Sequence, residues 1–223
     1  MLQPISGGAG SKPCKIQRDF MPRYFLTLFA LIAFAFAAPG ATAQQKFNLV
    51  ESVLNDPATP VGGNPKGDIT IVAFLDYNCP YCRRATPILD KVVAADGHVK
   101  VIYKDWPILA PSSVVAAKVA IAANYQGKYQ QAHDALMAVK LRPETLPAIK
   151  AAVQSAGIDI AQLDKDLAAH NGDIGALLQR NIAEADALHL QGTPVFLVGP
   201  YLIAGGLDEA GFRKAVASAR AAK

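Results

Sequence analysis

Residues 69–82 read ITIVAFLDYNCPYC, a strand-like run followed by two cysteines. The first seven residues are almost all β-branched or aromatic, which is typical of a strand buried on both faces. Cys79 and Cys82 follow, and residues 83–95 then have the apolar spacing of a helix. A Cys-x-x-Cys pair between a strand and a helix predicts a site of dithiol–disulfide exchange.

The N-terminal residues have the pattern of an export leader. Residues 24–38 form an apolar run with a basic flank, and residues 41–43 (ATA) form a small-x-small cleavage signal. We expect residues 1–43 to be a signal peptide that starts at Met21 and is cleaved after Ala43; the alternative is an uncleaved membrane anchor. Export predicts a periplasmic, oxidising compartment, where a disulfide persists.

The charge of the chain gives no indication of a nucleic-acid partner. The sequence has 22 basic and 18 acidic residues, and the leader holds four of the basic residues and one of the acidic ones. The remaining chain therefore has 18 basic and 17 acidic residues, a net charge of +1. This balance excludes a basic surface of the kind that binds nucleic acid.

After the leader, the pattern is strand, helix, strand, a helical block, two strands and a helix. Residues 44–67 are expected as an N-terminal extension that ends in a surface connection rich in Pro, Gly and Asn. The strands are expected at 69–75, 99–105, 195–198 and 201–203, and the helices at 79–95, 112–125, 128–139, 144–156, 160–169, 173–189 and 208–221. The first two strands should pair in parallel and the last two as a hairpin. The sequence therefore predicts an α/β domain over residues 68–223 with a helical insertion at about 110–190.

The spacing of the two cysteines suits redox chemistry. Side chains three residues apart on a helix lie close together, so a small adjustment brings two thiols within disulfide range. Cys79 would lie at the helix start, where unpaired N–H groups stabilise a thiolate. Arg83 and Arg84, one turn on, would add to this if their side chains lean toward the site. We expect Cys79 to be the nucleophile, open to a substrate, and Cys82 the resolving thiol.

A purely structural disulfide and a zinc site are the two alternatives to redox exchange. A disulfide that closes a loop of four residues stabilises a fold by only about 2 kcal/mol, against more than about 4 kcal/mol for a loop of some 80 residues, so a bracing role is disfavoured. A zinc site needs at least three protein ligands, and the four histidines are scattered at positions 98, 133, 170 and 189. No metal site is therefore expected.

Residues 74–84 (FLDYNCPYCRR) resemble the active-site segment of the DsbA-like thiol:disulfide oxidoreductases, with the best match to their periplasmic ScsC-type branch. Residues 104–109 (KDWPIL), 126–129 (QGKY) and 191–196 (QGTPVF) match as well. The resemblance runs from about residue 50 to the C-terminus. It implies a thioredoxin-like fold with an inserted helical subdomain.

The resemblance also implies roles for particular residues. Pro194 would be cis and face the dithiol, and the backbone of Thr193 would pair with the substrate chain as an added strand. Pro80 and Tyr81, between the cysteines, would support the site. One position departs from the pattern: many relatives carry a buried acid six residues before the first cysteine, where it helps to move the proton of the second thiol, and this chain has Ala73 there.

The expected function is exchange of disulfides with secreted or periplasmic proteins that carry thiols or disulfides. The oxidase and isomerase directions stay open, as does the oligomeric state, although residues 47–54 could form a modest dimer contact. A redox partner in the membrane is expected to recharge the dithiol, and no cofactor is needed. The alternatives are a copper- or zinc-handling protein that uses the dithiol as a soft-metal clamp, and a peptide-binding chaperone.

Overall fold

The computed structural model describes residues 48–139 and 145–223, and these residues fold around a five-stranded sheet in the order β1-β3-β2-β4-β5. The strands are β1 (Val61–Gly63), β2 (Ile69–Leu75), β3 (Val99–Asp105), β4 (Val195–Val198) and β5 (Tyr201–Ala204). β2 and β3 run parallel, whereas the pairs β1–β3, β2–β4 and β4–β5 are antiparallel. The strand that leads to the cysteines therefore lies at the centre of the sheet. The expected leader and its cleavage site lie outside the described residues.

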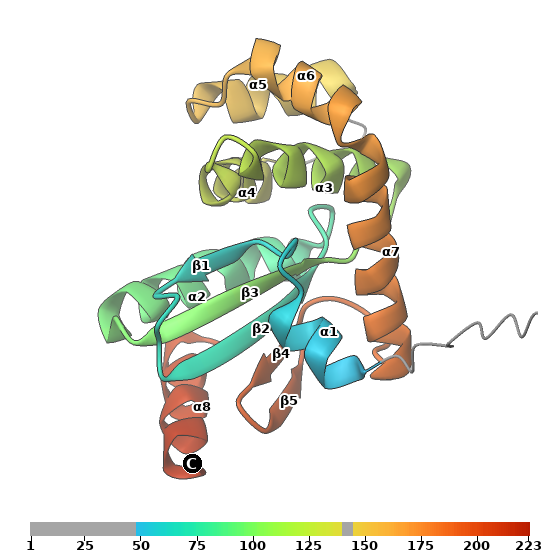
Figure 1. Cartoon of the computed structure of the whole chain (residues 1–223). Coiled ribbons are helices and arrows are strands. Elements are labelled where there is room, and N and C mark those ends of the chain that lie inside the picture. The colour runs from blue at the N-terminus through green and yellow to red at the C-terminus, as the bar shows by residue number, and fades with distance from the viewer. Residues whose placement is uncertain (1–47, 140–144) are drawn as a thin grey trace, which may run out of the picture. The chain divides into compact units, whose positions relative to one another are not determined.

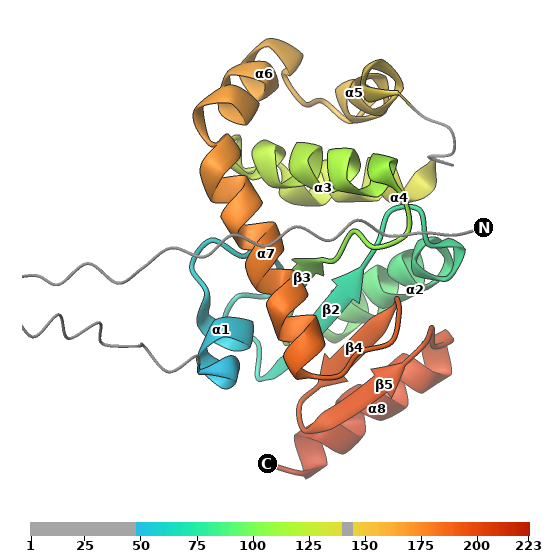
Figure 2. The ribbon, with the colours of Figure 1, turned by 90° about the vertical axis from the view of Figure 1, so that its right-hand side faces the viewer.

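Eight helices of the described residues surround the sheet. They are α1 (Leu49–Asn55), α2 (Pro80–Asp96), α3 (Pro111–Asn124), α4 (Tyr129–Ala138), α5 (Leu146–Ser155), α6 (Ile160–Ala169), α7 (Asn171–Ala187) and α8 (Glu209–Ala221). Figure 1 shows α3 to α6 as a helical block above the sheet, from which α7 runs back down to it. In Figure 2, α2 and α8 lie on one side of the sheet, and α1 and α7 lie on the other.

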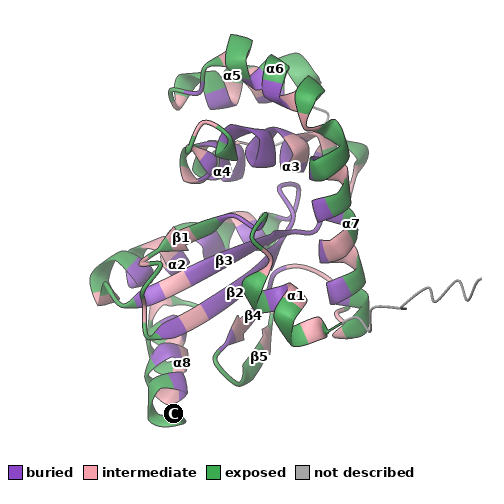
Figure 3. Ribbon diagram, viewed as in Figure 1, coloured by how far each residue is buried: buried purple, intermediate pink, exposed green. Residues whose placement is uncertain are grey.

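The two faces of the sheet belong to two apolar clusters. Ile71, Ala73 and Leu75 of β2 face the larger cluster, which includes residues of α2, α3, α4 and α8. Val72 and Phe74 face the smaller cluster, which includes Val53 of α1 and Ala185 of α7. Burial on both faces explains why β2 carries a nearly unbroken apolar run, and Figure 3 shows β2 and β3 among the most continuously buried parts of the ribbon.

A buried ion pair ties the N-terminal segment to the sheet. Nζ of Lys104 on β3 lies 2.9 Å from Oε2 of Glu184 on α7, and both side chains are fully buried. The same Nζ donates to the carbonyl of Ser52 in α1, at 3.1 Å, and to Oγ1 of Thr59, at 3.3 Å. Three separate segments therefore meet at one ammonium group. Such an arrangement holds α1 against the sheet because each hydrogen bond compensates part of the cost of burying the charge.

The architecture confirms the predicted α/β, thioredoxin-like fold class with an inserted helical subdomain. The structure also shows the expected parallel pair, the C-terminal hairpin and the Asp208 cap of the last helix, which accepts from the N–H of Gly211. The extension expected at residues 44–67 also contains the short helix α1 and the edge strand β1, neither of which is among the elements expected from the sequence. Gly63 allows the pairing of β1: its φ is +65°, and a Cβ there would lie 2.4 Å from the carbonyl oxygen of Val99.

Candidate active site

Cys79 lies where α2 begins, as the Cys-Pro pair predicts. Pro80 takes the first helical position, where its missing N–H removes no hydrogen bond of the helix. The backbone of Cys79 is extended, and its sulfur caps the helix by accepting the N–H of Cys82 at 3.4 Å. The unpaired N–H groups at the start of α2 are therefore directed toward this sulfur.

The Cys79 sulfur is less open than expected. The Cys79 residue is only 3% exposed, and Cys82 is fully buried; both are free thiols. The segment before β4 covers Cys79: the carbonyl oxygen of Thr193, in this segment, lies 3.2 Å from Sγ of Cys79. The neighbouring Pro80 and Tyr81 are exposed and Thr193 is half-buried, so Cys79 lies just beneath the surface.

The two thiols differ sharply in acidity. The pKa of Cys79 is lowered from its ordinary 9.0 to about 5. The largest cause is the hydrogen bond from the Cys82 side chain, and the Thr193 side chain and the backbone N–H groups of Cys82 and Tyr81 act in the same direction, against the effect of burial. Burial raises the pKa of Cys82, and the hydrogen bond to Cys79 raises it further. Cys79 is therefore a thiolate at neutral pH, and Cys82 stays protonated.

The structure brings the predicted second segment of the site, Thr193 and Pro194, against the dithiol. The peptide bond between these residues is cis, which confirms that prediction. The carbonyl of Pro194 accepts the N–H of Gly205, so the segment is fixed to the end of β5. The carbonyl of Thr193, by contrast, points at Cys79. The backbone beside the sulfur therefore comes from a segment more than a hundred residues away.

Tyr81 and the two arginines form the outer part of the site. Tyr81 is 59% exposed, and the guanidinium carbon of Arg84 lies 4.6 Å from the centre of its ring, within cation–π range. Arg83 donates to the carbonyl of Val139, just after α4, at 3.1 Å. Both guanidinium groups are engaged in these contacts. We therefore attribute the low pKa of Cys79 to hydrogen bonds from the side chains of Cys82 and Thr193 and from the backbone of Tyr81 and Cys82.

Ala73 lies in the larger apolar cluster and pairs with Tyr103 of β3 and Phe196 of β4. The acidic residue of the sheet that lies nearest in the register is Asp105, at the end of β3. It is buried and pairs with Leu75 of β2, two residues after Ala73. Burial raises the pKa of Asp105 to about 7, against the opposing hydrogen bonds of Tyr77 and Tyr129.

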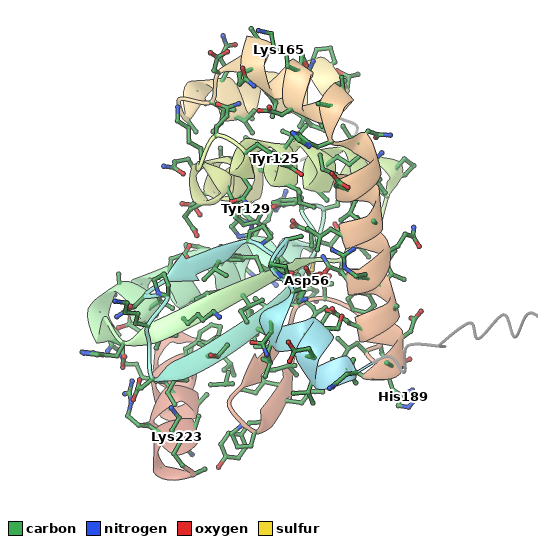
Figure 4. All side chains as sticks on the ribbon, in the orientation of Figure 1. Asp56, Tyr125, Tyr129, Lys165, His189 and Lys223 are labelled. Atoms are coloured by element: carbon green, nitrogen blue, oxygen red, sulfur yellow. The ribbon has the colours of Figure 1, made fainter. Side chains whose placement is uncertain are left out.

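Asp105 belongs to a buried polar cluster that joins residues 76–79, called here the dithiol turn, to the helical block. The hydroxyl of Tyr129 donates to Oδ2 of Asp105 at 3.1 Å. The hydroxyl of Tyr77 lies 3.0 Å from Nδ1 of His133 on α4, and burial lowers the pKa of that histidine to about 3. Figure 4 labels Tyr129, which lies on the side of the helical block that faces the sheet. His133 is therefore a neutral core residue at neutral pH.

Asp76 is a site residue that the sequence patterns did not single out. It follows the end of β2, and its buried carboxylate accepts hydrogen bonds from Asn78, from the segment before α3 and from Ser113 in α3. An acidic residue that directly follows a buried strand and lies three positions before a helix cap is the sequence signal that could have identified it.

Within residues 48–139 and 145–223, no group of three or more His, Cys, Asp or Glu side chains is placed to hold a metal ion. None of the helices in these two ranges is both long and apolar enough to cross a bilayer.

Comparison with known proteins identifies the family. A family model described as Thioredoxin matches residues 55–218. A thioredoxin-like oxidoreductase from Silicibacter pomeroyi DSS-3 is 39% identical with a TM-score of 0.71, and the match covers 78% of this chain and 98% of that one. The catalytic domain of Proteus mirabilis ScsC is 28% identical with a TM-score of 0.67, over 77% of this chain and 94% of the other.

Curated proteins give two kinds of relative. The thiol:disulfide interchange protein DsbA of Bordetella parapertussis is 28% identical over 214 residues, which are 86% of this chain and 93% of DsbA. A Na(+)/H(+) antiporter, NhaA 1 of Mycolicibacterium gilvum, is 29% identical over 163 residues, 72% of this chain, but the match spans only 26% of that relative. The family model and the solved relatives show that the chain belongs to the thioredoxin family, among its DsbA-like thiol:disulfide oxidoreductases.

Proposed function

We propose that this protein exchanges disulfides with exported polypeptides through Cys79 and Cys82. The observation that carries the proposal is the opposite acidity of two thiols one helical turn apart, with the pKa of Cys79 lowered to about 5 and that of Cys82 raised. A thiol of low pKa is a good leaving group in a mixed disulfide. The second, protonated thiol can lose its proton and attack the mixed disulfide, which releases the substrate.

The reaction starts from the Cys79–Cys82 disulfide. A substrate thiolate attacks the sulfur of Cys79, the bond between the two cysteines breaks, and Cys82 leaves and takes up a proton. A second substrate thiolate then attacks the substrate sulfur of the mixed disulfide, and Cys79 leaves as a thiolate. The substrate loses two electrons and gains a disulfide; of its two protons, one ends on Cys82 and the other in solvent.

Stabilisation of the Cys79 thiolate favours the oxidising direction, because it lowers the free energy of the reduced enzyme. We therefore place oxidation before isomerisation. A reduction potential near that of thioredoxin, about −270 mV, would contradict this direction, whereas a value well above about −200 mV would support it.

Thr193 and Pro194 are proposed to bind the substrate backbone. Their support is the half-buried position of Thr193 and its carbonyl contact with Cys79. An extended peptide that pairs with this segment as an added strand would bring its own sulfur to Cys79. Export to the periplasm, and a redox partner in the membrane that reoxidises the dithiol, are proposed from the leader pattern and the family.

Trapping of the mixed disulfide tests the proposal. Oxidised wild-type protein is mixed with a reduced, cysteine-containing model peptide, and Cys82→Ala is activated as a mixed disulfide with glutathione before it meets the same peptide. Wild-type protein should form the peptide disulfide, Cys82→Ala should accumulate a covalent peptide adduct, and Cys79→Ala should do neither. Equal adduct formation by Cys79→Ala and Cys82→Ala would contradict the assigned roles.

The alternative of a soft-metal clamp is tested separately. Within the described residues only the two sulfurs of the dithiol stand together as soft ligands, and two thiolates suffice for Cu(I). Equilibrium dialysis of the reduced protein and of Cys79→Ser against Cu(I) distinguishes the two functions. Stoichiometric, thiol-dependent binding together with slow peptide oxidation would favour the clamp.

A further inference from the structure

The carboxylate of Asp76 is buried, with 1% of the residue exposed, and it accepts four hydrogen bonds. Oδ1 accepts from the backbone N–H of Asn78 and from the hydroxyl of Ser113, each at 2.7 Å. Oδ2 accepts from the backbone N–H groups of Ile108 and Leu109, at 2.8 and 2.9 Å. Four donors occupy the acceptor sites of a carboxylate, so this group orients its neighbours.

One side of Asp76 fixes the dithiol turn. Its own carbonyl accepts the N–H of Cys79 at 3.0 Å, while its carboxylate holds the N–H of Asn78. The backbone N–H of Asp76 also donates toward the sulfur of Cys82. Asn78 strengthens the arrangement, because its side-chain amide donates to the hydroxyl of Ser113 at 2.8 Å. The conformation in which Cys79 caps α2 therefore depends on Asp76.

The other side of Asp76 fixes the segment 106–110, which joins β3 to α3. Trp106 anchors its start, since the Trp106 N–H donates to the carbonyl of Leu75 at 2.8 Å and its ring packs edge-on against Phe74. The two N–H groups that bond to Asp76 follow directly, and the side chains of Ile108 and Leu109 are 44% and 41% exposed. A single carboxylate thus holds a solvent-facing apolar segment beside the turn that carries the nucleophile.

We propose that Asp76 is a positioning residue for disulfide exchange, whose carboxylate holds the Cys79 turn and the 106–110 segment in the arrangement that a polypeptide substrate meets. The proposal rests on the proposed function for its substrate. It assigns to Asp76 no contact with the substrate and no transfer of a proton: the residue acts through the backbone groups that it binds.

Asp76→Asn tests the proposal, because the amide has the same shape but replaces one acceptor oxygen with a donor. Whichever way the amide turns, at least one backbone N–H loses its acceptor. We expect KM for a reduced model peptide to rise at least about fivefold, and the pKa of Cys79, measured by alkylation, to rise by about half a unit or more. Oxidation of dithiothreitol, a small dithiol that cannot reach both surfaces, should change less than peptide oxidation.

Ser113→Ala and Asp159→Asn complete the set of variants. Ser113→Ala removes one donor to Asp76 without changing the charge, and it should show the same changes at smaller size; it carries the test if Asp76→Asn does not fold. Asp159 caps α6 by accepting the N–H of Gln162 at 3.0 Å, and Figure 1 shows α6 in the layer of the helical block farther from the sheet. Asp159→Asn should leave KM and the Cys79 titration unchanged.

Two results separate this inference from the proposed function. Asp76→Asn with wild-type KM and a wild-type Cys79 titration would overturn the positioning role, even if it lowered stability. Wild-type protein that oxidises no peptide would instead overturn the proposed function, while alkylation would still report whether Asp76 fixes the Cys79 turn.

Discussion

Sγ of Cys79 lies 3.2 Å from the carbonyl oxygen of Thr193, 114 residues further along the chain. As a thiol, Cys79 donates a hydrogen bond to this oxygen. In the Cys79–Cys82 disulfide the sulfur has no proton to donate. The Thr193 carbonyl is then available to accept an N–H from a substrate strand, in the state of the protein that a reduced substrate meets.

The first prediction concerns the titration of the two thiols. The rate at which iodoacetamide modifies the reduced protein should follow a single ionisation with a midpoint near pH 5, because Cys79 is the thiolate at higher pH. Mass spectrometry should find the label on Cys79 alone at neutral pH, since the pKa of Cys82 is raised. In Cys79→Ser, Cys82 should stay unlabelled at neutral pH. A wild-type midpoint near that of free cysteine, about 8.5, would contradict the prediction.

The second prediction concerns the reduction potential. Above about pH 5, reduction of the disulfide takes up two electrons and one proton, because Cys79 stays ionised and Cys82 is protonated. The potential should therefore fall by about 30 mV per pH unit between pH 6 and 8, and by about 59 mV per unit below pH 5, where two protons are taken up. Equilibration with glutathione buffers across this range measures the slope. A slope of about 59 mV at neutral pH would show that both thiols are protonated there.

The fold was largely predictable because its signals are local. The apolar run of β2, the β-branched and aromatic residues of β3 and the cap at Asp208 are each local patterns of a few neighbouring residues, and the structure confirms all three elements. β1 was not predictable, because Val61–Gly63 has no strand pattern of its own and pairs only because β3 offers a free edge.

The site was predictable only as far as motifs reach. The cysteine pair and the Gly-Thr-Pro sequence indicated which segments meet, but not how far Thr193 covers Cys79. The position of Asp76 after a buried strand gives a local signal, but its bonds to Ile108 and Ser113 and the bond between Asp105 and Tyr129 join residues 24 to 37 positions apart, and no local pattern encodes them. Buried polar contacts of this kind follow from the packed structure.

The third prediction concerns the Lys104–Glu184 ion pair. Glu184→Gln leaves the Lys104 ammonium buried without its counter-charge, and it should lower the free energy of unfolding by about 3 kcal/mol or more. The double variant Lys104→Met, Glu184→Leu should lose less than Glu184→Gln alone, since no charge is then buried. Urea unfolding measures both values, and the alkylation midpoint of Cys79 should not move. A loss below about 1 kcal/mol in Glu184→Gln would indicate that solvent reaches the pair.

The last prediction concerns the pH dependence of stability caused by Asp105. Burial raises its pKa in the folded protein from 3.8 to about 7. Between these values the folded state binds a proton that the unfolded state does not, so the stability from this group is present below pH 4 and is lost as the pH rises through 7. Relative to Asp105→Asn, which does not titrate, the wild-type free energy of unfolding should fall by up to about 1.4 kcal/mol per pH unit across this window.

Tyr129→Phe gives the matched variant for Asp105. The Tyr129 hydroxyl donates to Oδ2 of Asp105 and lowers its pKa, so its removal should raise that pKa and extend the falling part of the stability curve above pH 7. Urea unfolding at intervals between pH 4 and 9 measures all three curves. If the wild-type and Asp105→Asn curves run parallel over this range, Asp105 has an ordinary pKa, and water must reach its carboxyl group in the folded protein.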